Sequence, residues 1–207
     1  TAEGAPFVPS TQKAEIRIAM EELFRRKAEE KGVRTIVLRA GDFYGGRKAG
    51  TWHDLMILAK LDKDVFVWPG PMDCPHAFAY LPDLGRAFAE LAERRDDLGT
   101  FEVFHFEGHT LTGDEVKAIA ETITSRTLKR RGVPWTLLRM AGLVKPMLRE
   151  VAIMSYLWRT PHSLDGSRLR AFLPDFRVTP PEQALRETIT DQGLWRPNTG
   201  STMRSAA

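Results

Sequence analysis

The sequence lacks several features that would assign a function directly. Its 207 residues include one cysteine, Cys74, so no disulfide can form within the chain, as is typical of a reducing compartment. No apolar run approaches the ~18 residues of a membrane-spanning helix. The Gly-x-x-x-x-Gly-Lys-Ser/Thr phosphate loop and the Gly-x-Ser-x-Gly nucleophile elbow are absent. These absences argue against a disulfide scaffold, a membrane span, P-loop phosphate chemistry and a hydrolase triad.

Charge and metal-ligand patterns add further exclusions. The net charge is +3, and the densest basic run, Lys129 to Arg131, is short and has no interleaved aromatic residues. His105 and His109 are separated by a strand end and a turn, and with Glu107 they offer too few convergent ligands for zinc. We therefore expect no metal, no nucleic-acid partner, no membrane partner and a cytoplasmic location.

The stretch from residue 33 to residue 46 is the most informative. Residues 35–38 form a β-branched apolar run between glycines, which predicts a strand buried in a parallel sheet. Arg39, Asp42 and Tyr44 follow in a glycine-punctuated loop. Ligands of open α/β sheets bind at the carboxyl ends of strands, so this loop is a candidate site. A core strand followed by an ordinary turn explains the same residues equally well.

Helical and strand periodicities alternate along the rest of the chain. Capping boxes at Thr112 to Glu115 and at Thr179 to Glu182 are predicted to begin helices, and Gly32 to end one. A helix leading directly into a buried strand is one step of a doubly wound α/β sheet. The predicted helices span residues 10–31, 52–61, 82–91, 112–125, 180–190 and stretches that begin at Pro134 and Pro146. The predicted strands span residues 35–38, 65–68, 76–80, 101–106 and 129–133.

Polar residues of the strand 76–80 suggest a second part of the site. His76 and Tyr80 are four positions apart, so they project to the same side of a strand. With Arg39 and Asp42 they could line one polar cleft, although two half-exposed edge residues fit the same spacing. Asp83 falls in the first turn of the next helix, where a simple favourable charge is the preferred explanation.

The order of these motifs resembles the second half of the extended short-chain dehydrogenase/reductases, the NAD(P)-dependent epimerase/dehydratase family. The resemblance rests on the helix that ends at Gly32, on Ile-Val-Leu-Arg-Ala-Gly-Asp-Phe-Tyr-Gly at 36–45 and on His-Ala-Phe-Ala-Tyr-Leu-Pro-Asp-Leu-Gly-Arg-Ala at 76–87. Residues 145–150, 154–158 and 179–182 are similar to an atypical subgroup labelled nucleoside-diphosphate-sugar epimerase-like. Together these motifs cover about residues 9 to 190.

The resemblance implies an α/β fold, namely the C-terminal part of a Rossmann-like parallel sheet with a smaller α/β substrate domain. Residues 1–50 would end the nucleotide-binding domain, and residues 51–195 would interleave substrate-domain elements with the last Rossmann elements. The Ser-, Thr-, Gly- and Asn-rich residues 196–207 are expected to form a disordered tail.

The resemblance also implies a cofactor, NAD or NADP, and a small polar substrate, for which a nucleotide sugar is one candidate. Proton transfer is expected from Tyr44, His76 or Tyr80, and the substrate side includes Asp83 as a further candidate. The residues expected at the cofactor are Arg17, Ala40, Asp42 and Phe43.

Two departures from the family pattern matter. The glycine-rich turn that binds the cofactor's pyrophosphate is missing, because the chain begins around the helix that carries the catalytic motif. We expect this chain alone to bind dinucleotide poorly. The family's Tyr-x-x-x-Lys pair would fall at Lys13 and Arg17, which cannot reproduce phenol chemistry, although Arg17 could contact a ribose or phosphate.

Two functions therefore remain open. The first is an epimerase/dehydratase-like oxidoreductase or isomerase, here truncated. The second is a non-catalytic member of the same fold that senses dinucleotide or binds a partner. A homodimer is left open in both cases.

Overall fold

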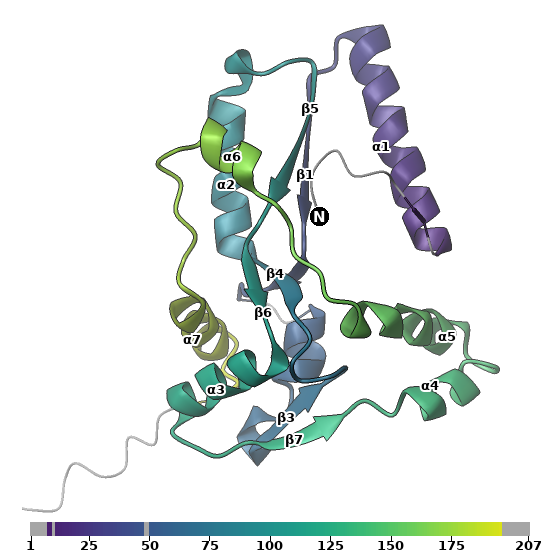
Figure 1. Ribbon diagram of the computed structural model, residues 1–207, viewed down its shortest axis with the longest axis vertical. Coiled ribbons are helices and arrows are strands. Elements are labelled where there is room, and N and C mark those ends of the chain that lie inside the picture. Colours follow the sequence, from purple (N-terminus) through teal and green to yellow (C-terminus); the bar gives the residue numbers. More distant parts are fainter. Residues whose placement is uncertain (1–7, 10, 48–49, 196–207) are drawn as a thin grey trace, which may run out of the picture.

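Helices and strands alternate along the chain in the computed structural model, which describes residues 8–9, 11–47 and 50–195 (Figure 1). The helices are α1 (Gln12–Lys31), α2 (Leu81–Glu93), α3 (Gly113–Thr124), α4 (Trp135–Ala141), α5 (Pro146–Ile153), α6 (Ser167–Phe172) and α7 (Pro181–Asp191). The strands are β1 (Thr35–Ala40), β2 (Asp42–Tyr44), β3 (Val65–Trp68), β4 (His76–Tyr80), β5 (Phe101–Phe106), β6 (His109–Leu111) and β7 (Lys129–Gly132). Short π and 3₁₀ turns are η1 (His53–Ile57), η2 (Leu61–Lys63), η3 (Arg95–Asp97) and η4 (Met154–Arg159).

The strands pair in three small sheets that follow one another down the molecule. β1 pairs in parallel with β5, and β3 pairs in parallel with β7. β4 lies between β2, which is parallel to it, and β6, which is antiparallel. The residues of β1 are half-buried and not fully buried as predicted, because among the described residues the second edge of β1 has no strand beside it. The predominance of parallel pairs, joined through helices, confirms the predicted α/β class.

Local signals place α1 beside β1. The hydroxyl of Thr11 accepts a hydrogen bond from the backbone N–H of Ala14 at 3.2 Å, which caps the first turn. Gly32 ends the helix in the left-handed conformation, with φ of 63°. Of the residues of α1, Ala28 is fully buried, whereas Ile16 and Met20 remain exposed.

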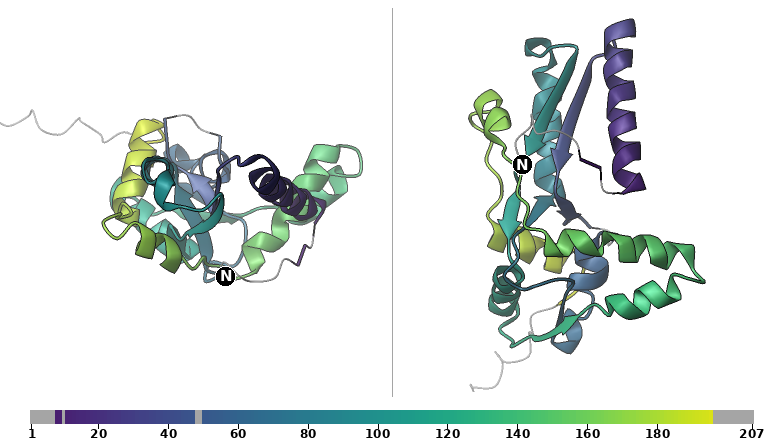
Figure 2. Two further views of the ribbon diagram at one scale, coloured as in Figure 1. Left: turned by 90° about the horizontal axis from the view of Figure 1, so that it is seen from above. Right: turned by 45° about the vertical axis from the view of Figure 1, so that its right-hand side comes forward.

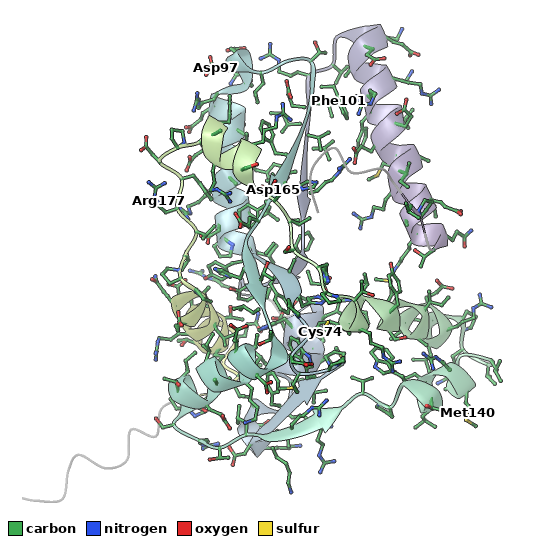
Figure 3. All side chains as sticks on the ribbon, viewed as in Figure 1. Cys74, Asp97, Phe101, Met140, Asp165 and Arg177 are labelled. Carbon is green, nitrogen blue, oxygen red and sulfur yellow. The ribbon has the colours of Figure 1, made fainter. Side chains whose placement is uncertain are left out.

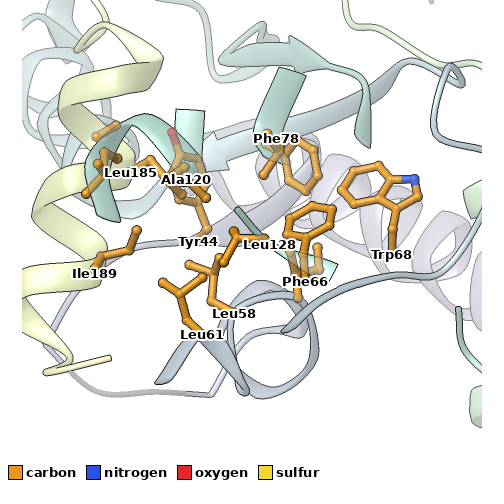
Figure 4. Close-up of a cluster of buried hydrophobic side chains, with 14 of the residues drawn as sticks. Tyr44, Leu58, Leu61, Phe66, Trp68, Phe78, Ala120, Leu128, Leu185 and Ile189 are labelled. Atoms are coloured by element: carbon orange, nitrogen blue, oxygen red, sulfur yellow. The ribbon is translucent and has the colours of Figure 1, made fainter. Parts of the chain in front are cut away.

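Two groups of buried side chains hold the elements together. The larger group lies where β3, β4, α3 and α7 meet, and Figure 4 shows Phe66, Trp68 and Phe78 within it. The smaller group joins α2 and α6 to β5 through Leu91, Phe104 and their neighbours. The backbone of β4 passes through this packed region, and all five of its residues are buried.

Three sequence expectations need correction or extension. The helix expected over residues 52–61 is instead the π turn η1 followed by η2, because the N–H of Leu58 bonds the carbonyl of His53 five residues back. The prediction of a capping box at Thr179 is wrong, because the Thr179 hydroxyl donates to Asp83 at 2.8 Å and no side chain caps the first turn of α7. The box at Thr112 is confirmed in both of its hydrogen bonds. The strands β2 and β6 and the helix α6 were not predicted, and β2 occupies the stretch that was expected to be a loop.

Two further observations concern the whole described chain. None of the helices in the described ranges combines the length and apolar character that a membrane crossing requires. Within the same ranges, no group of three His, Cys, Asp or Glu side chains converges as metal ligands would. The tail predicted over residues 196–207 lies outside the described residues.

Candidate functional site

A cleft of about 880 Å³ opens between the first turns of α1, the β2 strand and the α4–α5 pair. A volume of this size is in the range of small-molecule sites. Five stretches of the chain line the cleft, within residues 11–17, 42–43, 50–56, 133–138 and 151–156. The residues that the argument uses are Lys13, Arg17, Asp42, Phe43, Trp52, Trp135 and Tyr156.

The charges and rings of the cleft favour an anionic ligand that carries a ring. Lys13 and Arg17 are four residues apart on α1, so both lie on the face that borders the cleft. A guanidinium and an ammonium suit phosphate oxygens. Phe43, whose exposed fraction is 48%, and Trp52 supply aromatic faces for stacking.

Asp42 is the acidic residue among the described residues that line the cleft, and its carboxylate is hydrogen-bonded to His76. The Nε2 of His76 donates to Oδ2 of Asp42 at 2.8 Å. The Asp42 side chain is partly exposed, at 29%, whereas the His76 side chain is buried. The His76 ring stacks on Trp158 with ring centroids 4.0 Å apart and meets His162 edge-on at 4.3 Å. The carboxylate is therefore oriented from behind by a buried ring that is itself fixed by packing.

Tyr44 lies in the wall behind the cleft and is fully hydrogen-bonded. Its hydroxyl is 2.7 Å from Nδ1 of His109, and Nε2 of His109 is 2.7 Å from the carbonyl of Thr179. Since Nε2 must donate to that carbonyl, Nδ1 is the acceptor and Tyr44 donates to it. Burial raises the pKa of Tyr44 well above its usual value, so the phenol keeps its proton.

Tyr80 and Asp83 are also engaged within the protein. The Tyr80 hydroxyl donates to Oε2 of Glu187 at 2.6 Å, and burial raises the pKa of this phenol as well. Asp83 is buried and accepts three hydrogen bonds, from the Thr179 N–H at 2.6 Å, the Thr179 hydroxyl at 2.8 Å and Arg86 at 2.7 Å. Asp83 therefore anchors the segment that leads into α7, which is a larger role than a favourable helix charge.

The structure brings some of the expected site residues together and separates others. Arg17, Asp42 and Phe43 border one cleft, and His76 reaches it through Asp42. Ala40 lines a neighbouring hollow of about 490 Å³ between α1 and β1, to which Arg17 and Phe43 also contribute. Arg39 lies in that hollow too and pairs with Glu21 of α1.

Sequence reasoning missed the far wall of the cleft. Trp135 comes from α4 and Tyr156 from η4, more than 80 residues after Asp42. Trp158 and His162, which position His76, are equally distant. The family resemblance includes residues 154–158 but gives them no role in the site, because their proximity to α1 and β2 depends on the packing of the later helices.

Comparison with known proteins supports the fold. No protein-family model matches the sequence, and no curated protein matches it significantly. Solved structures of epimerases do match. One is UDP-glucuronic acid 4-epimerase from Bacillus cereus in complex with UDP-glucuronic acid and NAD, with TM-score 0.69 and 13% identity over 94% of this chain and 57% of that one. Another is UDP-N-acetylglucosamine 4-epimerase from Methanobrevibacter ruminantium, with TM-score 0.66 and 18% identity over 91% of this chain and 55% of that one.

A dehydratase matches to a similar degree. It is the dTDP-glucose 4,6-dehydratase DesIV from Streptomyces venezuelae with NAD and TYD bound, with TM-score 0.65 and 15% identity over 92% of this chain and 53% of that one. At such low identity the likeness establishes the fold alone, which is the Rossmann-like α/β fold of these epimerases and this dehydratase. The chain spans about half the length of the solved structures it matches.

Proposed function

We propose that this chain forms the substrate side and the nicotinamide end of an NAD(P)-dependent epimerase/dehydratase-like protein that acts on a small polar substrate of the nucleotide-sugar type. The observation that carries the proposal is the cleft in which Lys13 and Arg17 of α1 lie with Asp42 and Phe43 of β2. The bound NAD and UDP-sugar of a fold neighbour support it by analogy. A cytoplasmic location, where Cys74 stays reduced, belongs to the same proposal.

The residues present fit one end of the cofactor. Arg17 suits a ribose or phosphate, and Phe43 offers a ring face beside Asp42. The pyrophosphate requires backbone amides of a glycine-rich turn at a helix start, and these 207 residues contain no such motif. NAD(P), when bound, supplies reversible hydride transfer. Tight binding therefore needs a pyrophosphate site that this chain does not provide.

Proton transfer is assigned to groups that reach the cleft. Asp42 presents its carboxylate there as the proton acceptor, and His76 orients that carboxylate through its 2.8 Å hydrogen bond. Of the three tyrosines, Tyr156 is the one that lines the cleft. A role for Tyr44 or Tyr80 stays a prediction that requires each phenol to leave its present hydrogen-bond partner.

A calorimetric titration of NAD(H) and NADP(H) tests the cofactor assignment. It compares this chain with a version extended upstream to the start of its reading frame. We expect binding by the extended protein, weakened about ten-fold by Arg17→Ala because a phosphate or ribose contact is lost. Arg26→Ala, on the same helix but outside the cleft, serves as the matched control. Binding by neither form would discard the cofactor.

A second assay tests the acid–base assignment in the extended protein with a panel of nucleotide sugars. Asp42→Asn should lower kcat by about 100-fold or more, since the amide cannot accept the proton. Tyr156→Phe reports whether the phenol in the cleft takes part, and Tyr80→Phe tests the remaining prediction for the phenol that donates to Glu187. Cofactor binding without turnover of any sugar would refute the enzymatic function.

The alternative is a non-catalytic member of this fold that senses dinucleotide or binds a partner. Lys13 and Arg17 stand at the positions where the resembled family carries its Tyr and Lys, and both lie in the cleft. This arrangement favours binding of an anion over phenol chemistry. The alternative predicts that cofactor changes the affinity for a partner and that Tyr44→Phe leaves this response intact.

A further inference from the structure

The two helices α4 and α5 form a hairpin that projects from the body of the molecule in every view (Figures 1 and 2). At its tip, Leu143 and Val144 have exposed fractions of 87% and 84%. Met140, marked at the outer edge of α4 in Figure 3, is 63% exposed, and Met147 is 74% exposed. With Leu137 at 62%, these side chains form an apolar tip that nothing in the described residues covers.

The base of the hairpin is held by different side chains. Trp135 is buried, and its indole Nε1 donates to the carbonyl of Pro69 at 2.7 Å. Leu138 and Val151 line the cleft. At Gly142 a Cβ atom would come within 2.9 Å of the backbone of Arg149, so the helices approach closely there. The apolar tip is therefore presented by a fixed element and is separate from the cleft.

The charge of this region differs from that of the rest of the chain. Residues 122–164 contain eight Lys and Arg against one acidic residue, Glu150, for a net charge of +7. The other 164 residues contain 22 Lys and Arg against 26 Asp and Glu, for a net charge of −4. Lys145 directly follows Val144 at the tip, whereas Arg139 donates to Ser155 at 3.4 Å and Arg149 pairs with Glu150 at 3.7 Å. The four residues of β7, which leads into α4, are all exposed.

We propose that the α4–α5 hairpin docks on the surface of an anionic lipid bilayer. Leu143 and Val144 would enter the acyl boundary, and Lys145 would meet the lipid headgroups. Adjacent aliphatic residues beside Lys145 suit this surface better than a single-stranded nucleic acid, whose bases stack on exposed rings. The charge of Lys145 also limits insertion of the tip to the membrane interface.

Vesicle flotation of the purified chain tests the proposal. We expect binding to phosphatidylcholine vesicles with about 30% phosphatidylserine and little binding to phosphatidylcholine alone, with a loss of binding as salt increases. The double substitution Leu143→Asp and Val144→Asp should weaken binding about ten-fold or more. Lys145→Gln should weaken it about five-fold, the effect of one interfacial cation.

Matched controls lie at and just beyond the C-terminal end of α1, outside the α4–α5 hairpin. Val33→Asp places a charge on another exposed apolar residue, and Lys31→Gln removes another exposed cation. Both should leave vesicle binding unchanged. Circular dichroism checks folding, and if the double variant does not fold, Lys145→Gln decides the outcome. This readout requires no cofactor and no turnover, so it stands or fails separately from the proposed enzymatic function.

Four results of the vesicle and oligomer measurements would overturn the proposal. They are equal binding to neutral and anionic vesicles, unchanged binding of the tip variants, loss of binding in the upstream-extended protein, and a dimer that the double variant dissociates while vesicles remain unbound. The third result would show that further polypeptide covers the tip, and the fourth that the tip joins two copies of this chain. Binding to a mixed-sequence oligonucleotide in place of vesicles would overturn it as well.

Discussion

His53 is predicted to make the fold sensitive to acid. Its ring is buried in η1 against Tyr44, with centroids 4.9 Å apart, and edge-on to Phe78. No hydrogen-bond partner for its Nδ1 exists among the described residues. Burial lowers the pKa of His53 to about 4, an effect that His76 adds to and that the carboxylates of Asp42 and Asp54 oppose.

The sign and size of the effect follow from proton linkage. The unfolded chain binds the proton near pH 6.5, whereas the folded chain binds it only near pH 4. The stability contribution is thus complete above about pH 6.5 and is lost as the pH falls toward 4. Between about pH 7 and about pH 4.5, this one group should remove about 2 kcal/mol of unfolding free energy.

Urea unfolding of wild type and His53→Phe at both pH values measures this contribution. The phenyl ring keeps the packing against Tyr44 and Phe78 but does not titrate. Wild type should lose about 2 kcal/mol more than the variant on acidification, because contributions from other groups cancel in the comparison. Equal losses in the two proteins would refute the claim that His53 is buried in its neutral form.

Two further predictions concern anchoring contacts, both measured by urea unfolding near neutral pH. Asp83→Ala should lower the free energy of unfolding by about 3 kcal/mol, because three donors lose a buried acceptor. Arg86→Ala, which removes a half-exposed side chain, should lower it by less than about 1 kcal/mol. Similar losses in the two variants would contradict the anchoring role of Asp83. Gly41→Ala should lower the free energy of unfolding by about 2 kcal/mol or more, since its Cβ would lie 2.2 Å from the carbonyl oxygen of Ala77. Gly85 on α2 has open space around it, so Gly85→Ala should leave the stability unchanged or raise it. Equal effects of the two substitutions would refute the steric argument.

Local signals predicted much of the secondary structure. The cap of α1 at Gly32, the apolar run of β1 and the capping box at Thr112 depend on residue types and hydrogen bonds within a few residues. Their neighbours along the chain determine these features, so the pattern of residues was sufficient. The expectation of an α/β fold followed from the same local information, through the step from α1 into β1.

Tertiary packing decided the composition of the site. Strand alternation places His76 and Tyr80 on one side of β4, yet His76 turns to Asp42 and Tyr80 to Glu187 of α7. The capping pattern at Thr179 gave way to a buried acceptor, Asp83, some 96 residues earlier. Periodicity determines which side chains share a face of an element, but which faces meet depends on burial across the whole chain. Long-range packing therefore set the walls of the cleft and left the apolar tip of the hairpin exposed.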